Sequence, residues 1–468
     1  MTDTRHQDFQ ARIPIYPRSV KGRFRTLKWG ILALAYGVYF ALPWLRWPRE
    51  HGPAQAVMFD IPGRRFYLFD LVVHPQDIFW LAGLLMIAAV LLFLVTGVAG
   101  RVFCGYFCFQ TLWTDVYMFI EHLVQGERPA RIRLDKQPWG AEKFVKKGLT
   151  HAFWLLMAFA TGLTFTLYWA DAPVLIGQFF TGQAPFPAYA TALFLTATTY
   201  VMAGLAREQV CTYMCPYARF QAVMFDRDTL IVSYDEQRGE GPAGRARPGG
   251  DLKTREARRR AGVGDCIDCG YCVQVCPTGI DIRDGLQYQC IHCALCVDAC
   301  DAIMDRMGWP RGLIRYTSQN ALEGSRTHFF KAKTLGYAAV LLIMAGLLVW
   351  SIATQAPLDA TVSQVRQPLY VQLSDGSIQN SYEIKVNNKT QEPMELRVEL
   401  DGPEGMTLDL GRVDLVRLQP EHGITLLARV RYRVDPGARG PHDLVFRIVP
   451  ADGQEITPLE LPGHFHAP

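Results

Sequence analysis

Five stretches of about twenty residues with almost no charge constrain the fold of this chain more than any other feature of its sequence. A helix rises 1.5 Å per residue, so an apolar helix of this length covers the roughly 30 Å hydrocarbon layer of a membrane. A wholly soluble protein is therefore excluded. The first stretch begins well inside the chain, is rich in Trp and Tyr, and lacks a small-residue cleavage site, so we expect it to remain as a span. The predicted spans are residues 27–45, 78–100, 148–170, 185–206 and 334–354.

The distribution of Lys and Arg predicts the orientation of these spans, because cytoplasmic segments carry the excess of positive charge. Residues 1–28 hold seven Lys or Arg and residues 101–147 hold eight, whereas residues 171–184 hold none. We therefore expect the N-terminus and the second and fourth loops in the cytoplasm, and the C-terminal tail outside. The first connection, residues 46–77, is mixed in charge and supports this orientation least.

These spans divide the chain into five parts. They are a cytoplasmic N-terminal segment at 1–26, the first four spans with their loops at 27–206, a cytoplasmic domain with a linker at 207–333, the fifth span at 334–354 and an outer domain at 355–468.

Two segments of the cytoplasmic domain are biased in composition. The Gly/Pro/Arg stretch at 239–250 predicts a flexible surface linker. The basic run at 253–260 is compatible with nucleic-acid binding, but a juxtamembrane segment facing anionic lipid is favoured. We therefore expect the membrane, and no nucleic acid, as its partner.

The tail changes from long apolar stretches to short alternating ones. Apolar and polar residues alternate over 394–400, 424–434 and 444–448, and turn-forming residues separate these runs. A period of two is typical of strands with one buried face. The tail therefore predicts a small β-sandwich, and it contains no cysteine to link the sheets.

Eight of the twelve cysteines carry the strongest chemical signal. They form two runs of the pattern Cys-x-x-Cys-x-x-Cys-x-x-x-Cys, which is typical of bacterial ferredoxins with two [4Fe-4S] clusters. Three cysteines at i, i+3 and i+6 can surround one face of a cluster, while the fourth lies too far along the chain and crosses to the other cluster. We assign Cys266, Cys269, Cys272 and Cys300 to the first cluster, and Cys290, Cys293, Cys296 and Cys276 to the second.

Zinc is the alternative, because Cys-x-x-Cys pairs also bind zinc. Two zinc sites do not require a repeated triple with a trailing cysteine at the same spacing, so iron-sulfur clusters are favoured. Asp301 follows the second run where Pro277 follows the first, and it replaces a turn element and not a ligand. His292, between two ligands, is expected at the surface, with tuning of a cluster as the alternative.

The other four cysteines form two Cys-x-x-x-Cys pairs, Cys104 with Cys108 and Cys211 with Cys215, just after the second and fourth spans. Residues i and i+4 of a helix share a face, so each pair is expected to present two sulfurs together. The predicted orientation puts both pairs at the cytoplasmic membrane face, where four thiols can converge. Soft thiolates favour Cu(I), zinc or a further iron-sulfur centre. The alternative is that these cysteines pack as small apolar residues.

Two clusters in series with a thiol site amount to an electron path. Thiolates prefer Cu(I) and so favour the reduction of Cu(II). Copper held by the four membrane thiols is therefore the most economical terminal acceptor.

Three segments resemble the cytochrome c oxidase accessory protein family CcoG, also called FixG or RdxA. They are IYPRSVKGRFRTLKW near the N-terminus, REQVCTYMCPYARFQAVMFDRDTLIVSYD at 207–235 and the cysteine-rich block at 264–324. The resemblance implies a five-span bacterial inner-membrane ferredoxin that reduces Cu(II) to Cu(I) for assembly of the cbb-type haem-copper oxidase. It also implies that Cys104, Cys108, Cys211 and Cys215 are the paired membrane thiols of the family. Phe109 departs from the family, which has proline there, and this puts the geometry of the first pair in doubt.

The expected fold is thus a multi-domain membrane protein with a five-helix transmembrane bundle, a cytoplasmic bacterial-type 2[4Fe-4S] ferredoxin domain and a periplasmic immunoglobulin-like β-sandwich. The expected activity is that of a cupric reductase, with copper chaperones or oxidase assembly factors as partners. The rival hypothesis is a polyferredoxin relay between membrane quinol and another redox enzyme, and an assembly scaffold is a third. The sequence leaves open the electron donor, cytoplasmic or membrane, and whether the chain forms a homodimer.

Overall fold

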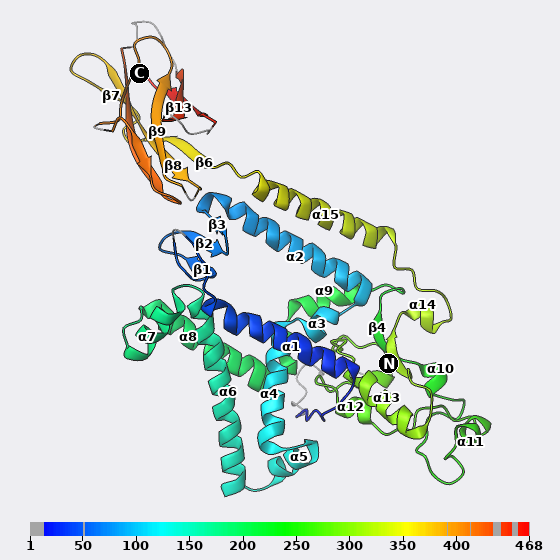
Figure 1. Ribbon diagram of the computed structural model, residues 1–468. Helices are drawn as coiled ribbons and strands as arrows, with labels where there is room; N and C mark the ends of the chain where they lie inside the picture. Colours follow the sequence, from blue (N-terminus) through cyan, green and yellow to red (C-terminus); the bar gives the residue numbers. More distant parts are fainter. Residues whose placement is uncertain are drawn as a thin grey trace, which may run out of the picture. The chain divides into compact units, whose positions relative to one another are not determined.

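Five helices of the computed structural model are long and apolar enough to cross a membrane, within the described residues 14–49, 52–390, 392–411, 413–433, 441–451 and 457–467. Figure 1 shows them as α1 Arg23–Ala41, α2 Ile78–Ala99, α6 Ala141–Leu167, α8 Phe186–Thr199 and α15 Ala332–Ala353. Short 3-10 and π-helical turns extend the first span to Trp44 and the fourth to Ala206. The prediction of five apolar helices of membrane-spanning length is confirmed.

Helix α6 begins seven residues before the span predicted at 148–170. Its first turns carry Glu142, Lys143, Lys146 and Lys147, which hydropathy excludes from a span. Lys146 pairs with Glu142 at 2.7 Å, an i, i+4 pair that supports a helix in water. The helix therefore continues beyond its apolar part, and hydropathy does not mark its start.

The first and third connections contain short regular elements. Strands β1 Val57–Asp60 and β2 Arg65–Leu68 form an antiparallel pair, and β3 Leu71–Val73 follows. The third connection forms helix α7 Ala172–Thr181, whose N-cap Asp171 accepts the N–H of Val174. Neither the strands nor this helix was predicted from the sequence.

The second connection folds into three helices, α3 Val102–Tyr106, α4 Phe109–Gln125 and α5 Arg128–Lys136. Glu121 of α4 is mostly buried and bridges two arginines. Its carboxylate lies 2.9 Å from Arg131 of α5 and also pairs with Arg207, just after the fourth span. These ion pairs hold α4 and α5 against the end of the fourth span.

The ferredoxin domain lies between the fourth and fifth spans. Strands β4 Ile231–Tyr234 and β5 Ile314–Thr317 form an antiparallel pair, and α13 Leu295–Met307 is the longest helix of this domain. Its short helices are α9 Pro216–Met224, α10 Glu236–Gly239, α11 Arg255–Arg260, α12 Tyr271–Gln274 and α14 Gln319–Leu322. Several cysteines belong to its apolar core, which also contains Val232, Ile282, Val297, Met304 and Leu313.

A carboxylate of the ferredoxin domain caps the first membrane helix. Asp298 of α13 accepts the backbone N–H groups of Phe24 at 3.2 Å and Arg25 at 2.8 Å. The first N–H groups of a helix have no partner within the helix, so this carboxylate provides an acceptor for two N–H groups that would otherwise lack one. The cap accounts for the start of α1 at Arg23, four residues before the predicted span.

Two predictions for the ferredoxin domain need correction in part. The segment 239–250 is not a free linker throughout, because Cys266 N–H donates to the Gly239 carbonyl at 3.2 Å and Ala243 N–H donates to the Gly262 carbonyl at 2.9 Å. The basic run 253–260 is not wholly exposed, because one of its arginines is buried in the domain. Its Arg258 is fully buried and donates to the carbonyls of Gly264 and Cys266 at 2.8 Å each. Both segments therefore support the loop that begins with Cys266.

The C-terminal domain is an immunoglobulin-like β-sandwich. One sheet contains β10 Thr407–Asp409, β12 Gly423–Tyr432, β8 Ile378–Asn388 and β6 Leu358–Gln364 in this order, with β7 Val371–Gln372 paired to β8. The other contains β11 Val416–Leu418, β9 Met394–Asp401, β13 His442–Pro450 and β14 Leu459–Phe465.

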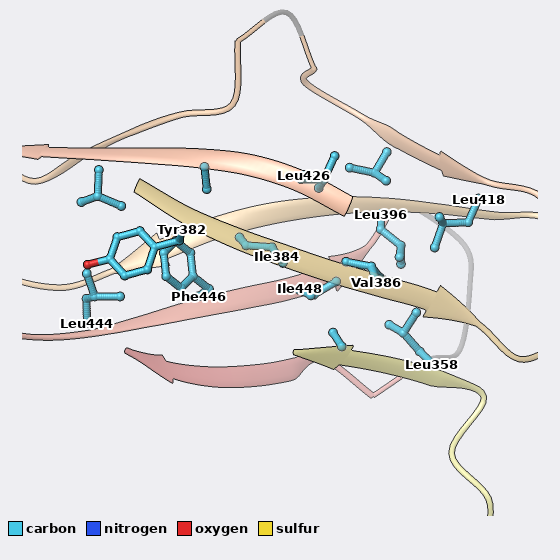
Figure 2. Packing of buried hydrophobic residues seen from close by; sticks show 14 of the residues in the cluster. Leu358, Tyr382, Ile384, Val386, Leu396, Leu418, Leu426, Leu444, Phe446 and Ile448 are labelled. Atoms are coloured by element: carbon cyan, nitrogen blue, oxygen red, sulfur yellow. The ribbon is translucent and has the colours of Figure 1, made fainter. Parts of the chain in front are cut away.

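The inner faces of the two sheets form the core of the sandwich. Figure 2 shows Tyr382 and Ile384 of β8 packed with Phe446 and Ile448 of β13, and the rings of Tyr382 and Phe446 lie 5.1 Å apart. The alternation predicted over 424–434 holds for Leu426, Ala428 and Val430, which are buried. Ile424, at the start of the strand, is exposed, and Val434 lies outside the described residues.

Candidate metal centres

Two cavities in the ferredoxin domain are lined by the eight ferredoxin cysteines. The first, with an empty volume of about 380 Å³, is lined by Cys266, Cys269, Cys272 and Cys300. The second, of about 350 Å³, is lined by Cys276, Cys290, Cys293 and Cys296. Each set takes three cysteines from one run and the last cysteine from the other, as crossed ligation requires. Cys272 also lines the second cavity, so the two cavities are neighbours.

The two ligand loops share one backbone conformation. Asp268 and Gly270, in the first loop, have φ of 50° and 63°; His292 and Ala294, at the equivalent positions of the second, have φ of 51° and 57°. Positive φ is uncommon for residues other than glycine, so its repetition at matching positions is a specific feature and not a chance one. The loops are therefore built to hold the same kind of group.

Most of these thiols are withdrawn from water, with the exposed Cys269 as an exception. Burial raises the pKa of Cys272 to about 12 and that of Cys290 to about 12, and it also raises the pKa of Cys293, Cys296 and Cys300. Without a metal these thiols hold their protons at neutral pH. Metal binding must displace those protons, so assembly of the sites is favoured by rising pH.

The spacing of the sulfurs bears on the choice between zinc and iron-sulfur clusters. Within the part of the chain that the structure describes, no three His, Cys, Asp or Glu side chains gather closely enough for a single metal ion. Four thiolates on one zinc at about 2.3 Å would lie less than about 4 Å apart. A cluster suits a wider set, because each thiolate binds a different iron. The crossed division of the eight cysteines between the two cavities favours a cluster over a zinc ion.

The two membrane cysteine pairs do not lie on continuous helices, contrary to our prediction. Cys104 lies in the short helix α3, and Cys108 is the N-cap of α4 with φ −65° and ψ 126°. Cys211 lies in the π-helical turn Val210–Met214, and Cys215 is the N-cap of α9. Each pair therefore spans a break between two helices.

The break in the second pair has a clear cause, because Pro216 is suited to the first position of a helix and cannot continue one. Phe109 takes the same position in the first pair. The chain still breaks there, and the Cys108 carbonyl accepts the N–H groups of Thr111 and Leu112 at 3.0 Å each. Phe109 at this position therefore still allows Cys108 to serve as the N-cap of α4.

The two pairs converge. Cys104 and Cys108 lie close enough to Cys211 to raise the pKa of its thiol, although burial is the larger cause and brings that pKa to about 12. Burial also raises the pKa of Cys104 and Cys108, and Cys215 adds to both effects. The structure therefore places the four thiols that we predicted to meet near one another.

The loop of the first membrane pair packs directly on the second ligand loop of the ferredoxin domain. Gly105 has no side chain to separate them: a Cβ there would lie 2.7 Å from the Ile291 carbonyl oxygen and 3.0 Å from Cys293 Cα. Tyr106 donates from its hydroxyl to the Cys293 carbonyl at 3.0 Å. The membrane thiols therefore adjoin the second ligand set.

A hydrogen-bond chain joins the same two loops. The Cys104 thiol donates to Gln221 Oε1 at 3.2 Å, and Arg101 Nε donates to the same oxygen at 2.9 Å. Arg101 also donates its backbone N–H to His292 Nδ1 at 3.0 Å. The side chains of Cys104, Gln221, Arg101 and His292 are all buried, so these hydrogen bonds are protected from water.

His292 is buried, and its prediction as a surface residue was wrong. Its ring stacks on Phe225 with centroids 5.7 Å apart. Burial lowers the pKa of His292 to about 3, with Arg101 adding to the effect, so the imidazole is neutral. A neutral ring can accept from Arg101 through Nδ1 without adding charge beside the ligands.

Comparison with known proteins gives the family. Residues 206–319 match the model described as "4Fe-4S dicluster domain", 81–124 match "4Fe-4S binding domain", and 348–468 match the immunoglobulin-like fold at the C-terminus of FixG. RdxA of Cereibacter sphaeroides is 41% identical over 465 residues, which cover 96% of each chain. The chain belongs to the FixG/RdxA family.

Two further relatives support this assignment. RdxB of Cereibacter sphaeroides is 44% identical over 86% of this chain and 85% of its own length. The nitrogen fixation protein FixG of Rhizobium meliloti is 40% identical over 86% of this chain and 81% of its own. This FixG/RdxA family member is therefore a multi-pass iron-sulfur membrane protein with two matched 4Fe-4S regions.

The sequence did not reveal the residues that join the two sites of this FixG/RdxA family member. Arg101, Gly105, Tyr106 and Gln221 carry no ligand chemistry of their own, so the cysteine spacing gave no reason to select them. Gly105 and Tyr106 lie inside the Cys-x-x-x-Cys pattern, and that position is the one signal that could have marked them.

Proposed function

We propose that this protein delivers electrons from the ferredoxin domain to Cu(II) at the membrane thiols. The observation that carries the proposal is the contact of Gly105, within the first thiol pair, with the backbone of Cys293. When bound, a [4Fe-4S] cluster accepts and donates one electron at a time. Cys269 is exposed, so the first ligand set is accessible to solvent. The second ligand set packs against the loop of the first membrane thiol pair.

Copper would be the substrate of the thiol site. Cu(II) takes one electron and becomes Cu(I), and no proton is transferred to the metal. Thiolates stabilise the softer Cu(I), so a pair of them favours the product. Cys108 and Cys215 occupy equivalent positions, at the N-termini of α4 and α9.

The cellular role that we propose is supply of Cu(I) for assembly of the cbb-type cytochrome c oxidase in the bacterial inner membrane, with copper chaperones or assembly factors as partners. The Lys and Arg distribution supports a cytoplasmic N-terminus and ferredoxin domain and a periplasmic C-terminal domain. The family resemblance supports the oxidase as the recipient.

A third [4Fe-4S] cluster at the membrane thiols is the second candidate. The match of residues 81–124 to a 4Fe-4S binding domain favours it. These residues contain only two cysteines, Cys104 and Cys108, so Cys211 and Cys215 would have to supply the other ligands. The chain would then act as a three-cluster relay to another redox enzyme. Iron analysis separates the candidates, because two clusters hold about eight iron atoms and three hold about twelve.

The test of the proposal is the double variant Cys211→Ser with Cys215→Ser. Hydroxyls do not favour Cu(I), so we expect this variant to insert, to hold about eight iron per chain and to bind no copper. Tyr213→Phe, an exposed residue of the same turn, is the matched control and should bind copper normally. Normal copper binding in the double variant would contradict the proposal, and a loss of about four iron atoms would favour the third cluster.

A further inference from the structure

A third cavity lies beside the second ligand set, between the N-terminal part of α1, helix α4 and the ferredoxin domain. It opens to solvent, and its wall combines aromatic, apolar and charged side chains, as ligand sites do. Val275 and Pro277, the neighbours of Cys276, line it together with Leu295, the neighbour of Cys296. An occupant of this cavity would therefore touch residues that flank two proposed cluster ligands.

One part of the cavity wall is aromatic and apolar. Trp29 of α1 and Phe119 of α4 line it, with ring centroids 5.4 Å apart and their planes near perpendicular, and Met118 lies beside them. Phe119 is an exposed apolar side chain. An exposed apolar face next to a membrane helix is suited to lipid, so a hydrophobic ligand could enter from the bilayer.

The other part of the wall is polar and titratable. Asp115 of α4 lines the cavity and forms an ion pair with Lys28 at 2.9 Å, and both side chains are almost fully buried. Arg25 also reaches Asp115, at 3.3 Å. Taking both charges out of water is costly, and the pair places a carboxylate at the wall of the cavity. Lys28 and Asp115 also lie close enough to Cys293 to affect the pKa of its thiol.

His122 gives the cavity an outlet for protons. It lies one turn beyond Met118 on α4, lines the cavity, and is partly exposed to water. Its Nδ1 is 3.8 Å from the Glu127 carboxylate, which is also partly exposed. A proton taken up by this imidazole can therefore leave to solvent.

We infer that this cavity binds a membrane quinol and that the quinol is the electron donor of the protein. This inference rests on the proposed electron-transfer role. A quinol carries an aromatic ring and a hydrophobic tail, which suit Trp29 and Phe119, and two hydroxyls, which suit Asp115 and His122. Its oxidation to the quinone releases two electrons and two protons. Two bound [4Fe-4S] clusters would supply the acceptors for one electron each, and His122 provides a route for the two protons to water.

The test uses anaerobically purified full-length protein with oxidised clusters, decylubiquinol as the probe, and the visible absorbance of the clusters as the readout. We expect decylubiquinol to bleach the clusters, with about one quinol consumed for two clusters reduced. Met118→Trp should fill the cavity and slow this reduction by about tenfold or more, equivalent to about 1.4 kcal/mol. Leu123→Trp, on the same helix outside the cavity, is the matched control and should leave the rate unchanged.

Dithionite separates this inference from the proposed function. All three proteins should be bleached by dithionite, and the reduced proteins should then reduce Cu(II). Failure of decylubiquinol to bleach the wild-type clusters, or equal rates in all three proteins, would overturn the quinol site even if Cu(II) reduction persists. Bleaching by quinol without Cu(II) reduction would support the quinol site and refute the copper proposal.

The cavity also contains cationic side chains, so an anionic phospholipid headgroup is the competing occupant. Native mass spectrometry of the same three proteins addresses it. Phospholipid bound to the wild type and lost from Met118→Trp, without any reduction by decylubiquinol, would overturn the inference and assign the cavity to lipid.

Discussion

The contact between Gly105 and the second ligand loop allows a sharp test, because a single methyl group should disturb it. In Gly105→Ala the new Cβ would lie 2.7 Å from the Ile291 carbonyl oxygen, whereas contacts shorter than 3.4 Å are already unusually tight. The obstacle is backbone and not a flexible side chain, so the two loops must move apart by several tenths of an ångström. Overpacking of this kind costs about 1–3 kcal/mol.

The expected result for Gly105→Ala is a lower thermal unfolding midpoint and slower transfer from the reduced clusters to Cu(II), measured by stopped-flow absorbance. Both cluster signals should remain in the resting protein, because no ligand is changed. Gly148→Ala is the control, since a Cβ at this helical position meets nothing within 4 Å. Alanine stabilises a helix relative to glycine by roughly 0.5–1 kcal/mol, so this control should unfold no earlier than the wild type.

An unchanged unfolding midpoint together with an unchanged transfer rate in Gly105→Ala would refute the reasoning. That outcome would mean that the membrane thiol loop and the second ligand loop are not in contact in the working protein. A lower unfolding midpoint with a normal rate of electron transfer would show that the contact exists but does not lie on the electron path.

Three further predictions concern the cap of the first span, the first ligand loop and the topology. Asp298→Ala should lower the free energy of unfolding by about 0.5–2 kcal/mol through loss of the helix cap, as measured by denaturant unfolding. Asp298→Asn should retain most of the stability that the cap provides. Arg258→Gln should leave buried carbonyls without donors, costing about 1–3 kcal/mol, and paramagnetic resonance should show damage to the first cluster before the second. A reporter active only outside the cytoplasm should work when fused after Thr354 or within 171–184 and stay silent at 247–250; silence after Thr354 would reverse the orientation of the C-terminal domain.

The sequence was sufficient for features with a strict chemical or periodic signal. Five apolar stretches predicted five spans, alternation predicted the sandwich, and the cysteine spacing predicted the two sets of thiols that line the cavities. These features depend on local pattern and composition, so they can be recognised without knowledge of the tertiary structure.

Features that depend on contacts between distant segments could not be predicted in this way. Asp298 accepts a hydrogen bond from Arg25, 273 residues earlier in the chain, and Arg258 is buried although its neighbours in sequence suggested an exposed basic run. The helix breaks at Cys108 and Cys215 were missed because the i, i+4 rule assumes a continuous helix. Pro216 was the local signal for one of these breaks, whereas Phe109 gave no signal for the other.

The most direct test of electron delivery to copper is paramagnetic resonance of the dithionite-reduced protein, freed of excess reductant and mixed anaerobically with Cu(II). We predict that the cupric signal disappears as the reduced-cluster signal is lost, with about two Cu(II) consumed per chain because each cluster gives one electron. The Cys211→Ser, Cys215→Ser double variant should keep both signals. A cupric signal that persists beside reduced clusters in the wild-type protein would contradict the account.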